Sequence, residues 1–158
     1  MYEHPDSIIS VEISAPESSE TAPAHILSAS KDGTVYVWTL KADESHATDE
    51  ILTYVADLCL DEPITKAKWL NDKTFLVATT MGNVYSVALE KDSQEAECLS
   101  KPKLVTSTEH GVAVWDLAVF SNGSTSFEVW LAEDSGKVTQ LSFDASLQLT
   151  KQATTFVS

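Results

Sequence analysis

The sequence contains no arginine, and its ten basic residues are all lysines. Arginine carries the planar guanidinium that proteins most often use to bind phosphate groups and guanine bases. The chain also has 24 acidic residues, which give a formal net charge of −14 and a surface that repels a nucleic-acid backbone. We therefore expect no direct binding to nucleic acid. A protein partner with basic segments is one interpretation of the acids, and simple solubility is the other.

Long apolar runs are absent as well. No stretch approaches the roughly 20 apolar residues of a membrane-spanning helix, and the start, MYEHPDSIIS, lacks the basic and apolar segments of a secretory signal. We expect no membrane association and an intracellular location, in the nucleus or the cytoplasm. The two cysteines, Cys59 and Cys98, lie far apart without a Cys or His neighbour at metal-ligand spacing, which predicts reduced thiols and no metal site.

Motifs of catalysis are missing too. The sequence has no Gly-x-Ser-x-Gly turn, no glycine-rich phosphate loop, no His-Glu-x-x-His metal helix and no aspartate-rich calcium loop. We predict that this chain carries no catalytic residues and binds no cofactor.

Glycine is scarce, with five residues, and three of them share one position of an internal repeat. The repeat consists of two apolar segments rich in Val, Thr and aromatic residues, separated by a turn that contains the glycine: ILSASKDGTVYVWTL (26–40), FLVATTMGNVYSVAL (75–89) and VWLAEDSGKVTQLSF (129–143). Such segments favour strands, and glycine adopts the positive φ that a tight hairpin needs.

Each of these hairpins has a strand-like segment on either side. The preceding segments share one apolar pattern, in HPDSIISVEI (4–13), LDEPITKAKW (60–69) and HGVAVWDLAV (110–119), and the following ones are 51–58, 103–108 and 149–157. Four strands in a repeat of about 50 residues are typical of a β-propeller blade. We predict an all-β fold, a partial β-propeller of about three four-stranded antiparallel blades: blade 1 over about 4–58, blade 2 over 60–108 and blade 3 over 110–157.

The first unit resembles a blade of the WD-repeat family. In that family a His before the first strand, a Ser or Thr in the second, the Asp of the turn and the Trp of the third strand form a hydrogen-bonded chain. The matching residues here are His4, Ser28 or Ser30, Asp32 and Trp38. The resemblance implies that these side chains hold the blade together, since buried polar groups need partners.

The resemblance weakens along the chain. Blade 3 retains the histidine as His110, whereas the other matching positions hold Leu60, Met81 and Val87 in blade 2 and Ser135 and Leu141 in blade 3. The family dipeptide is also absent, because Thr39 follows Trp38, and the Trp-Asp pair at 115–116 lies in a first strand. A polar chain is therefore predicted for blade 1 alone.

The blade count implies that something covers the ends. Propellers close with four to eight blades, so about three blades would leave sheet faces open. We expect the remaining blades to come from a longer form of this chain or from a completing chain. The four tryptophans, Trp38, Trp69, Trp115 and Trp130, lie on predicted strands where neighbouring blades would bury them.

Acidic residues fall at both rims of the predicted propeller. Polar loops over 15–24, 41–50 and 90–102 would form one rim. The other would hold the turns between second and third strands and the links between blades, with Asp32 and the candidate partner-binding acids Asp6, Asp61, Glu62, Glu109 and Asp134. Propellers of this family commonly bind peptides at this second rim, which suggests a Lys- or Arg-rich ligand; the alternative is that the acids are solvated and Asp32 is structural.

Two classes of function fit these observations. The first is a non-enzymatic scaffold for protein–protein interaction, a WD-repeat-like subunit of an intracellular complex. The alternative is part of a propeller enzyme whose catalytic residues lie outside this segment.

Overall fold

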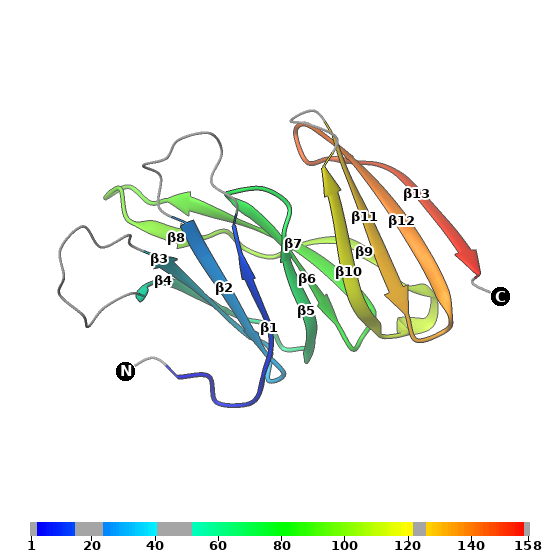
Figure 1. The fold of residues 1–158 in the computed structure, drawn as a ribbon, viewed down its shortest axis with the longest axis horizontal. Helices are drawn as coiled ribbons and strands as arrows, with labels where there is room; N and C mark the ends of the chain where they lie inside the picture. Colours follow the sequence, from blue (N-terminus) through cyan, green and yellow to red (C-terminus); the bar gives the residue numbers. More distant parts are fainter. Residues whose placement is uncertain (1–2, 15–23, 41–51, 122–125, 157–158) are drawn as a thin grey trace.

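The computed structural model describes residues 3–14, 24–40, 52–121 and 126–156. In these residues the regular structure is β-strand, apart from one 3₁₀ turn, η1 (Glu109–Gly111). The strands form three antiparallel sheets that follow one another in chain order (Figure 1). The predicted all-β fold, a partial β-propeller with three blades, is confirmed.

Blades 1 and 3 have simple up-and-down topology. Blade 1 contains β1 (Ile8–Ile13), β2 (Ala24–Ser30), β3 (Thr34–Leu40) and β4 (Leu52–Cys59) in that order. Blade 3 contains β10 (Val114–Ser121), β11 (Ser126–Glu133), β12 (Lys137–Asp144) and β13 (Leu149–Phe156).

Blade 2 departs from this plan at its outer strand. Its first three strands are β5 (Ile64–Trp69), β6 (Thr74–Thr79) and β7 (Asn83–Lys91), and two short strands, β8 (Glu97–Leu99) and β9 (Lys103–Ser107), both pair with β7. The expectation of a loop over 90–102 is thus wrong at its start, where β7 extends to Lys91, and over 97–99, where β8 pairs with β7. The other two expected loops fall almost entirely in 15–23 and 41–51, which are outside the described residues.

The repeat extends to irregularities of the backbone. Each first strand has a break in register near its start, between Ile8 and Ser10, Ile64 and Lys66, and Val114 and Asp116, and these pairs occupy the same position of the repeat. A second recurring feature is a backbone hydrogen bond between the residue after the second strand and the segment before the first strand of the same blade. These bonds run from Lys31 N to Ser7 O (3.0 Å), from Thr80 N to Pro63 O (3.0 Å) and from Asp134 N to Ala113 O (2.9 Å). Because bulges re-aim the strand that carries them, their recurrence indicates three copies of one unit.

Two of the turn glycines are fixed by close contact with the next link. Gly33 has φ +98°, and a Cβ there would lie 2.2 Å from the carbonyl oxygen of Leu60. Gly82 has φ +78°, and a Cβ there would lie 2.0 Å from Thr108 Oγ1. Because glycine has no side chain, the segment that leaves blade 1 can cross the turn at Gly33, and the segment that leaves blade 2 can cross the turn at Gly82. At these crossings the amides of Leu60 and Thr108 donate to the carbonyls of Gly33 and Gly82.

Apolar cores lie between the blades. The first joins the side of blade 1 that carries Leu27, Ala29, Val35 and Val37 to the side of blade 2 that carries Phe75, Val77 and Val87. The second joins the opposite side of blade 2, with Leu76, Ala78 and Val84, to Val129, Leu131, Leu141 and Phe143 of blade 3. This alternation along β6 explains why its burial is nearly continuous: both of its faces are covered.

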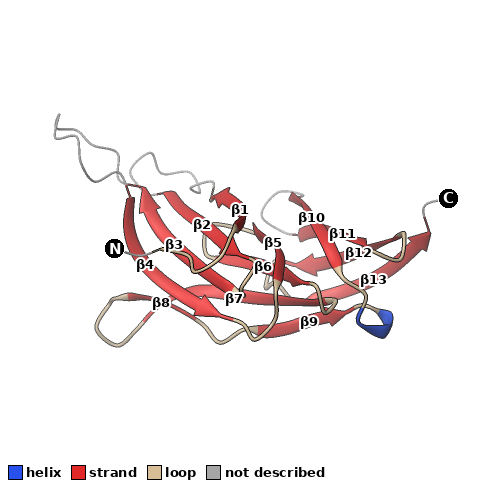
Figure 2. Ribbon diagram, turned by 90° about the horizontal axis from the view of Figure 1, so that it is seen from below, coloured by secondary structure: helices blue, strands red, loops and turns tan. Residues whose placement is uncertain are grey.

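The inner strands also connect the blades. Figure 2 shows β5 between β1 and β10. Ser10 Oγ donates to the carbonyl of Ala67 at 3.0 Å, and Thr65 Oγ1 donates to the carbonyl of Val114. These side chains bind backbone groups on inner strands, which fixes how the blades lie against one another.

One face at each end of the stack has no neighbour in the described chain. On blade 1 this face carries Ile26, Ser28, Tyr36 and Trp38, and on blade 3 it carries Trp130. Trp69, between blades 1 and 2, is 8% exposed, as expected, whereas Trp115 and Trp130 are 54% and 41% exposed. Both of these belong to blade 3, where no following blade covers the sheet.

Candidate functional site

The predicted acidic rim exists as one edge of the blade stack. The turns between second and third strands and the links before first strands meet there, held by the recurring backbone bonds described above. We call this the acidic edge and define it by six residues that the sequence placed there: Asp6, Asp32, Asp61, Glu62, Glu109 and Asp134. The structure divides these acids into exposed ones and ones that bind the blades.

Four of the acids are exposed, and Glu109, the one among them that forms an ion pair, is described below. Asp6 accepts a hydrogen bond from the amide of Ser7 at 2.6 Å, and Asp134 accepts one from Trp115 Nε1 at 2.8 Å. Asp61 lies in the link between blades 1 and 2. The carboxylates of Asp6, Asp61 and Asp134 face solvent, so they can meet a basic ligand without first giving up a buried contact.

The structure brings together all four residues of the hydrogen-bonded chain expected in blade 1. Trp38 Nε1 donates to Ser28 Oγ at 2.9 Å, and Ser28 Oγ lies 2.8 Å from His4 Nε2. His4 reaches Asp32 through a residue that the sequence reasoning had missed: His4 Nδ1 lies 2.9 Å from Thr34 Oγ1, which donates to Asp32 Oδ1 at 2.7 Å. Ser28, not Ser30, is therefore the serine of the chain.

Of the two neutral tautomers of His4, one satisfies every bond in this chain. The Ser28 hydroxyl accepts from Trp38 and so can donate to Nε2, while the Thr34 hydroxyl donates to Asp32 and so can accept from Nδ1. This assigns the neutral tautomer protonated on Nδ1. Burial lowers the pKa of His4, although the charge of Asp32 acts in the opposite direction, and the neutral form is thereby favoured.

Blade 2 has a hydrogen-bond network of different composition in the same place. Glu62 accepts from Thr79 Oγ1 and Tyr85 Oη, both at 2.6 Å, and from Asn83 Nδ2 at 2.9 and 3.1 Å. This corrects the expectation that Glu62 faces a partner, because its two oxygens bind side chains of β6 and β7. It also corrects the expectation that only blade 1 has a polar chain.

The bonds to Glu62 change two pKa values. Burial alone would raise the pKa of Glu62, but hydrogen bonds from Thr79, Tyr85 and Asn83 outweigh it and lower the pKa below its usual value. The same carboxylate, with burial, raises the pKa of Tyr85 to about 12. The ionised glutamate and the protonated phenol thus stabilise each other.

At blade 3 the acidic edge holds an ion pair instead. Glu109 Oε2 lies 2.8 Å from Lys137 Nζ, and the hydrogen bond lowers the pKa of Glu109 and raises that of Lys137. His110, the retained histidine of the repeat, does not take the place of His4: its backbone is left-handed, with φ 62°, and its side chain is 86% exposed. The histidine is present in the sequence, but the local backbone turns it away from the blade.

The residues missed by sequence reasoning carry a signal that is visible in the repeat. Thr34, Asn83 and Lys137 occupy one position of the aligned hairpins, just after the turn glycine, and each is polar. A polar residue at the same position in all three repeats indicates that its side chain forms a hydrogen bond within the blade or with the segment that precedes it.

No group of three or more His, Cys, Asp or Glu side chains is arranged to hold a metal ion in the described part of the chain. Within those ranges no helix has the length and apolar character needed to span a bilayer. Cys59 and Cys98 are free thiols.

The fold and the acidic edge define the class of the molecule as a partial, three-bladed β-propeller-like protein. No protein-family model matches the chain, and no curated protein matches its sequence significantly.

The chain through Ser28 predicts a stability effect. Replacing Ser28 by Ala should lower the free energy of unfolding by about 1–3 kcal/mol, because it leaves Trp38 Nε1 and His4 Nε2 without partners. Urea denaturation followed by tryptophan fluorescence measures the change. Ser142→Ala, at a half-buried strand position of blade 3, is the control and should change stability by less than about 0.5 kcal/mol. Equal effects of the two substitutions would contradict the prediction.

The network of Glu62 predicts a dependence on pH. Its lowered pKa means that its stabilising effect is complete above the unfolded-state value of 4.5 and is lost as the pH falls through the lower folded-state value. Glu62→Gln should therefore be less stable than the unchanged chain at neutral pH, with the difference shrinking below pH 4.5. Urea denaturation at a series of pH values measures this, with Asp61→Asn as the exposed control. A difference that stays constant with pH would show that the carboxylate charge contributes nothing.

Proposed function

We propose that this chain is a WD-repeat-like propeller segment that acts as a non-enzymatic scaffold within an intracellular protein complex, in the nucleus or the cytoplasm. The observation that carries the proposal is the acidic edge, where Asp6, Asp61 and Asp134 present exposed carboxylates on a rigid frame of strand ends. A basic protein segment is the ligand whose chemistry complements this edge.

Charge favours the same ligand. The chain has 24 acids and ten lysines, so its field attracts positive segments from a distance and repels nucleic acid. The acidic edge is also where the sheet ends are fixed by turn-to-link hydrogen bonds, and a rigid surface loses little entropy when it binds.

We further propose that other four-stranded blades cover the two open faces, either from a longer form of this chain or from a completing chain. Repeat positions support this assignment. Trp130, Ala132 and Val138 occupy the positions of Leu27, Ala29 and Val35, which form the core between blades 1 and 2. At the other end, Ile26 and Trp38 occupy the positions of Phe75 and Val87, which face blade 1 in that same core.

Reversing exposed charges of the acidic edge should weaken binding of a lysine-rich peptide. The double variant Asp6→Lys and Asp61→Lys is expected to lower the affinity roughly tenfold and to reduce its dependence on salt, since two attractions become repulsions. Glu62 is left in place because its carboxylate holds blade 2 together. Fluorescence anisotropy of a labelled peptide measures the affinity at low and moderate salt.

The matched control reverses two exposed acids at the opposite edge. Glu90→Lys with Glu95→Lys, in and beside the turn between β7 and β8, changes the net charge by the same amount. Equal loss of affinity in both double variants would show that only net charge matters and would overturn the assignment of the site to the acidic edge.

The open faces predict self-association of the isolated chain. Without other blades, the face of blade 3 should pack against the corresponding face of a second copy, and the mass measured by sedimentation should rise with concentration. Trp130→Lys should weaken this association by at least about tenfold, because a buried tryptophan contributes strongly to interfaces. Leu104→Lys, at a side chain 52% exposed on the outer strand β9, is the control. A chain that stays monomeric at all concentrations would contradict the prediction.

A further inference from the structure

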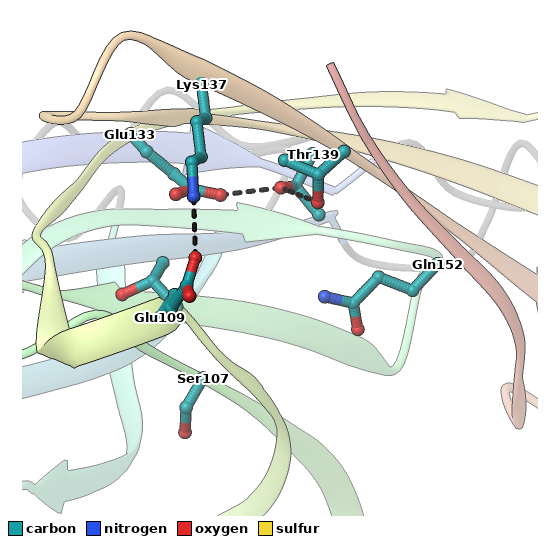
Figure 3. Close-up of a pocket in the computed structure, with 8 residues that line it drawn as sticks. Ser107, Glu109, Glu133, Lys137, Thr139 and Gln152 are labelled. Carbon is teal, nitrogen blue, oxygen red and sulfur yellow. Dashed lines mark hydrogen bonds and ion pairs between the residues drawn. The ribbon is translucent and has the colours of Figure 1, made fainter. Parts of the chain in front are cut away.

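A polar cavity of about 300 Å³ lies between blades 2 and 3 at the acidic edge (Figure 3). Glu133, Lys137 and Thr139 line it from one side, Ser107 and Glu109 from another, and the side chain of Gln152 comes from β13. The remaining lining residues are Thr108 and Thr154. The cavity is therefore built from the outer strand of one blade and the turn and strands of the next.

The repeat explains the space at this place. Tyr36, Tyr85 and Thr139 occupy the same position of the three hairpins. In blade 1 the ring of Tyr36 lies against His4, with centroids 4.4 Å apart, and in blade 2 the hydroxyl of Tyr85 binds Glu62. Thr139 is too short to fill the equivalent space; it lines the cavity and the residue is 2% exposed.

The link before blade 3 does not fill the space either. Blades 1 and 2 each insert a link side chain, His4 and Glu62, into their polar networks. At the corresponding link His110 points to solvent, as its 86% exposed side chain shows. The cavity thus lies where blades 1 and 2 each place a tyrosine and a side chain from the link, and where blade 3 has neither.

The lining carries an excess of negative charge. Glu109 binds Lys137 Nζ at 2.8 Å, while the second carboxylate, Glu133, accepts from two neutral hydroxyls, Thr139 Oγ1 at 2.6 Å and Ser135 Oγ at 3.3 Å. The charge of Glu133 adds to that of Glu109 in raising the pKa of Lys137. Two carboxylates against one ammonium leave a net charge of minus one. Further polar atoms come from Thr154 Oγ1, 2.9 Å from Thr139 Oγ1, and from Gln152, whose Oε1 accepts from Thr106 at 3.0 Å.

We propose that this cavity binds an arginine side chain of the partner, with Glu133 as the main acceptor and Glu109 as the second. The guanidinium is planar, so it suits a space that a tyrosine ring fills in the other blades, and it has five donors for acceptors on several sides. A lysine ammonium is a point charge and leaves part of this space empty. The proposal rests on the proposed function and deepens it, because it specifies one side chain of the basic ligand.

The test uses the 158-residue chain and three blocked peptides of equal length, in which a central arginine, lysine or citrulline is flanked by glycine. Amide NMR titration gives the affinities and locates the shifts. We expect the arginine peptide to bind about tenfold more tightly than the lysine peptide, and citrulline, which lacks the charge, more weakly still. Shifts should concentrate at Glu109, Glu133 and Gln152. Equal affinity for arginine and citrulline would overturn the proposal.

Two variants locate the site. Thr139→Tyr restores the side chain that the other blades have at this position and should abolish arginine binding by filling the cavity. Thr155→Tyr makes the same change on the opposite face of the same sheet, at an exposed position, and should leave binding unchanged. Glu133→Gln keeps the size of the side chain and removes the charge, so it should lower the affinity at least about tenfold even if Thr139→Tyr does not fold.

The outcomes separate this proposal from the proposed function. If the Asp6 and Asp61 reversals weaken the lysine-rich peptide but Thr139→Tyr and Glu133→Gln leave arginine binding intact, the cavity proposal is wrong and the acidic edge stands. If the cavity variants abolish arginine binding while the reversals have no effect on the lysine-rich peptide, the cavity binds arginine and the broader edge does not bind basic segments.

Discussion

Each blade of this protein is apolar on both faces, so none of them can bury its side chains without a neighbour. Blade 2 meets this requirement on both sides, through Phe75 and Val77 on one face and Leu76 and Ala78 on the other. The remaining features follow from this packing. Because the blades must lie face to face, their turns and links meet at common edges, and the acids of those turns and links form one surface.

The polar networks show that one structural task is solved three times with different residues. In blade 1 His4 and Ser28 join the strands, in blade 2 Glu62 does so, and in blade 3 Glu133 and Thr139 form a smaller version beside an ion pair. Each network satisfies polar groups at a place where the next segment of chain crosses the blade. Blades 2 and 3, which lack the motif residues of blade 1, are therefore still held by polar networks of their own.

The acidic edge combines structural and exposed carboxylates, and the difference determines which of them can bind a partner. Asp32 and Glu62 accept hydrogen bonds from their own blades, and breaking those bonds to reach a ligand would leave partly buried donors unpaired. Asp6, Asp61 and Asp134 carry no such penalty because they are exposed. The cavity beside Glu133 is intermediate: its carboxylate is held in place, yet the space in front of it is not filled by the described chain.

The sequence alone determined most of the strands and their grouping into three blades, because strand periodicity, turn glycines and repeat spacing are local properties of the chain. A resemblance to a known family implied four members of the blade 1 chain, with Ser28 and Ser30 as alternatives, but it did not include Thr34. The sequence did not determine where Glu62 points, that His110 turns outward, or that β8 forms within an acidic loop. Those outcomes depend on contacts between residues far apart in the chain, such as Glu62 with Tyr85 and the outer strands with neighbouring blades. Only the tertiary structure decided them, since a side chain's partner is set by packing and not by its own sequence neighbours.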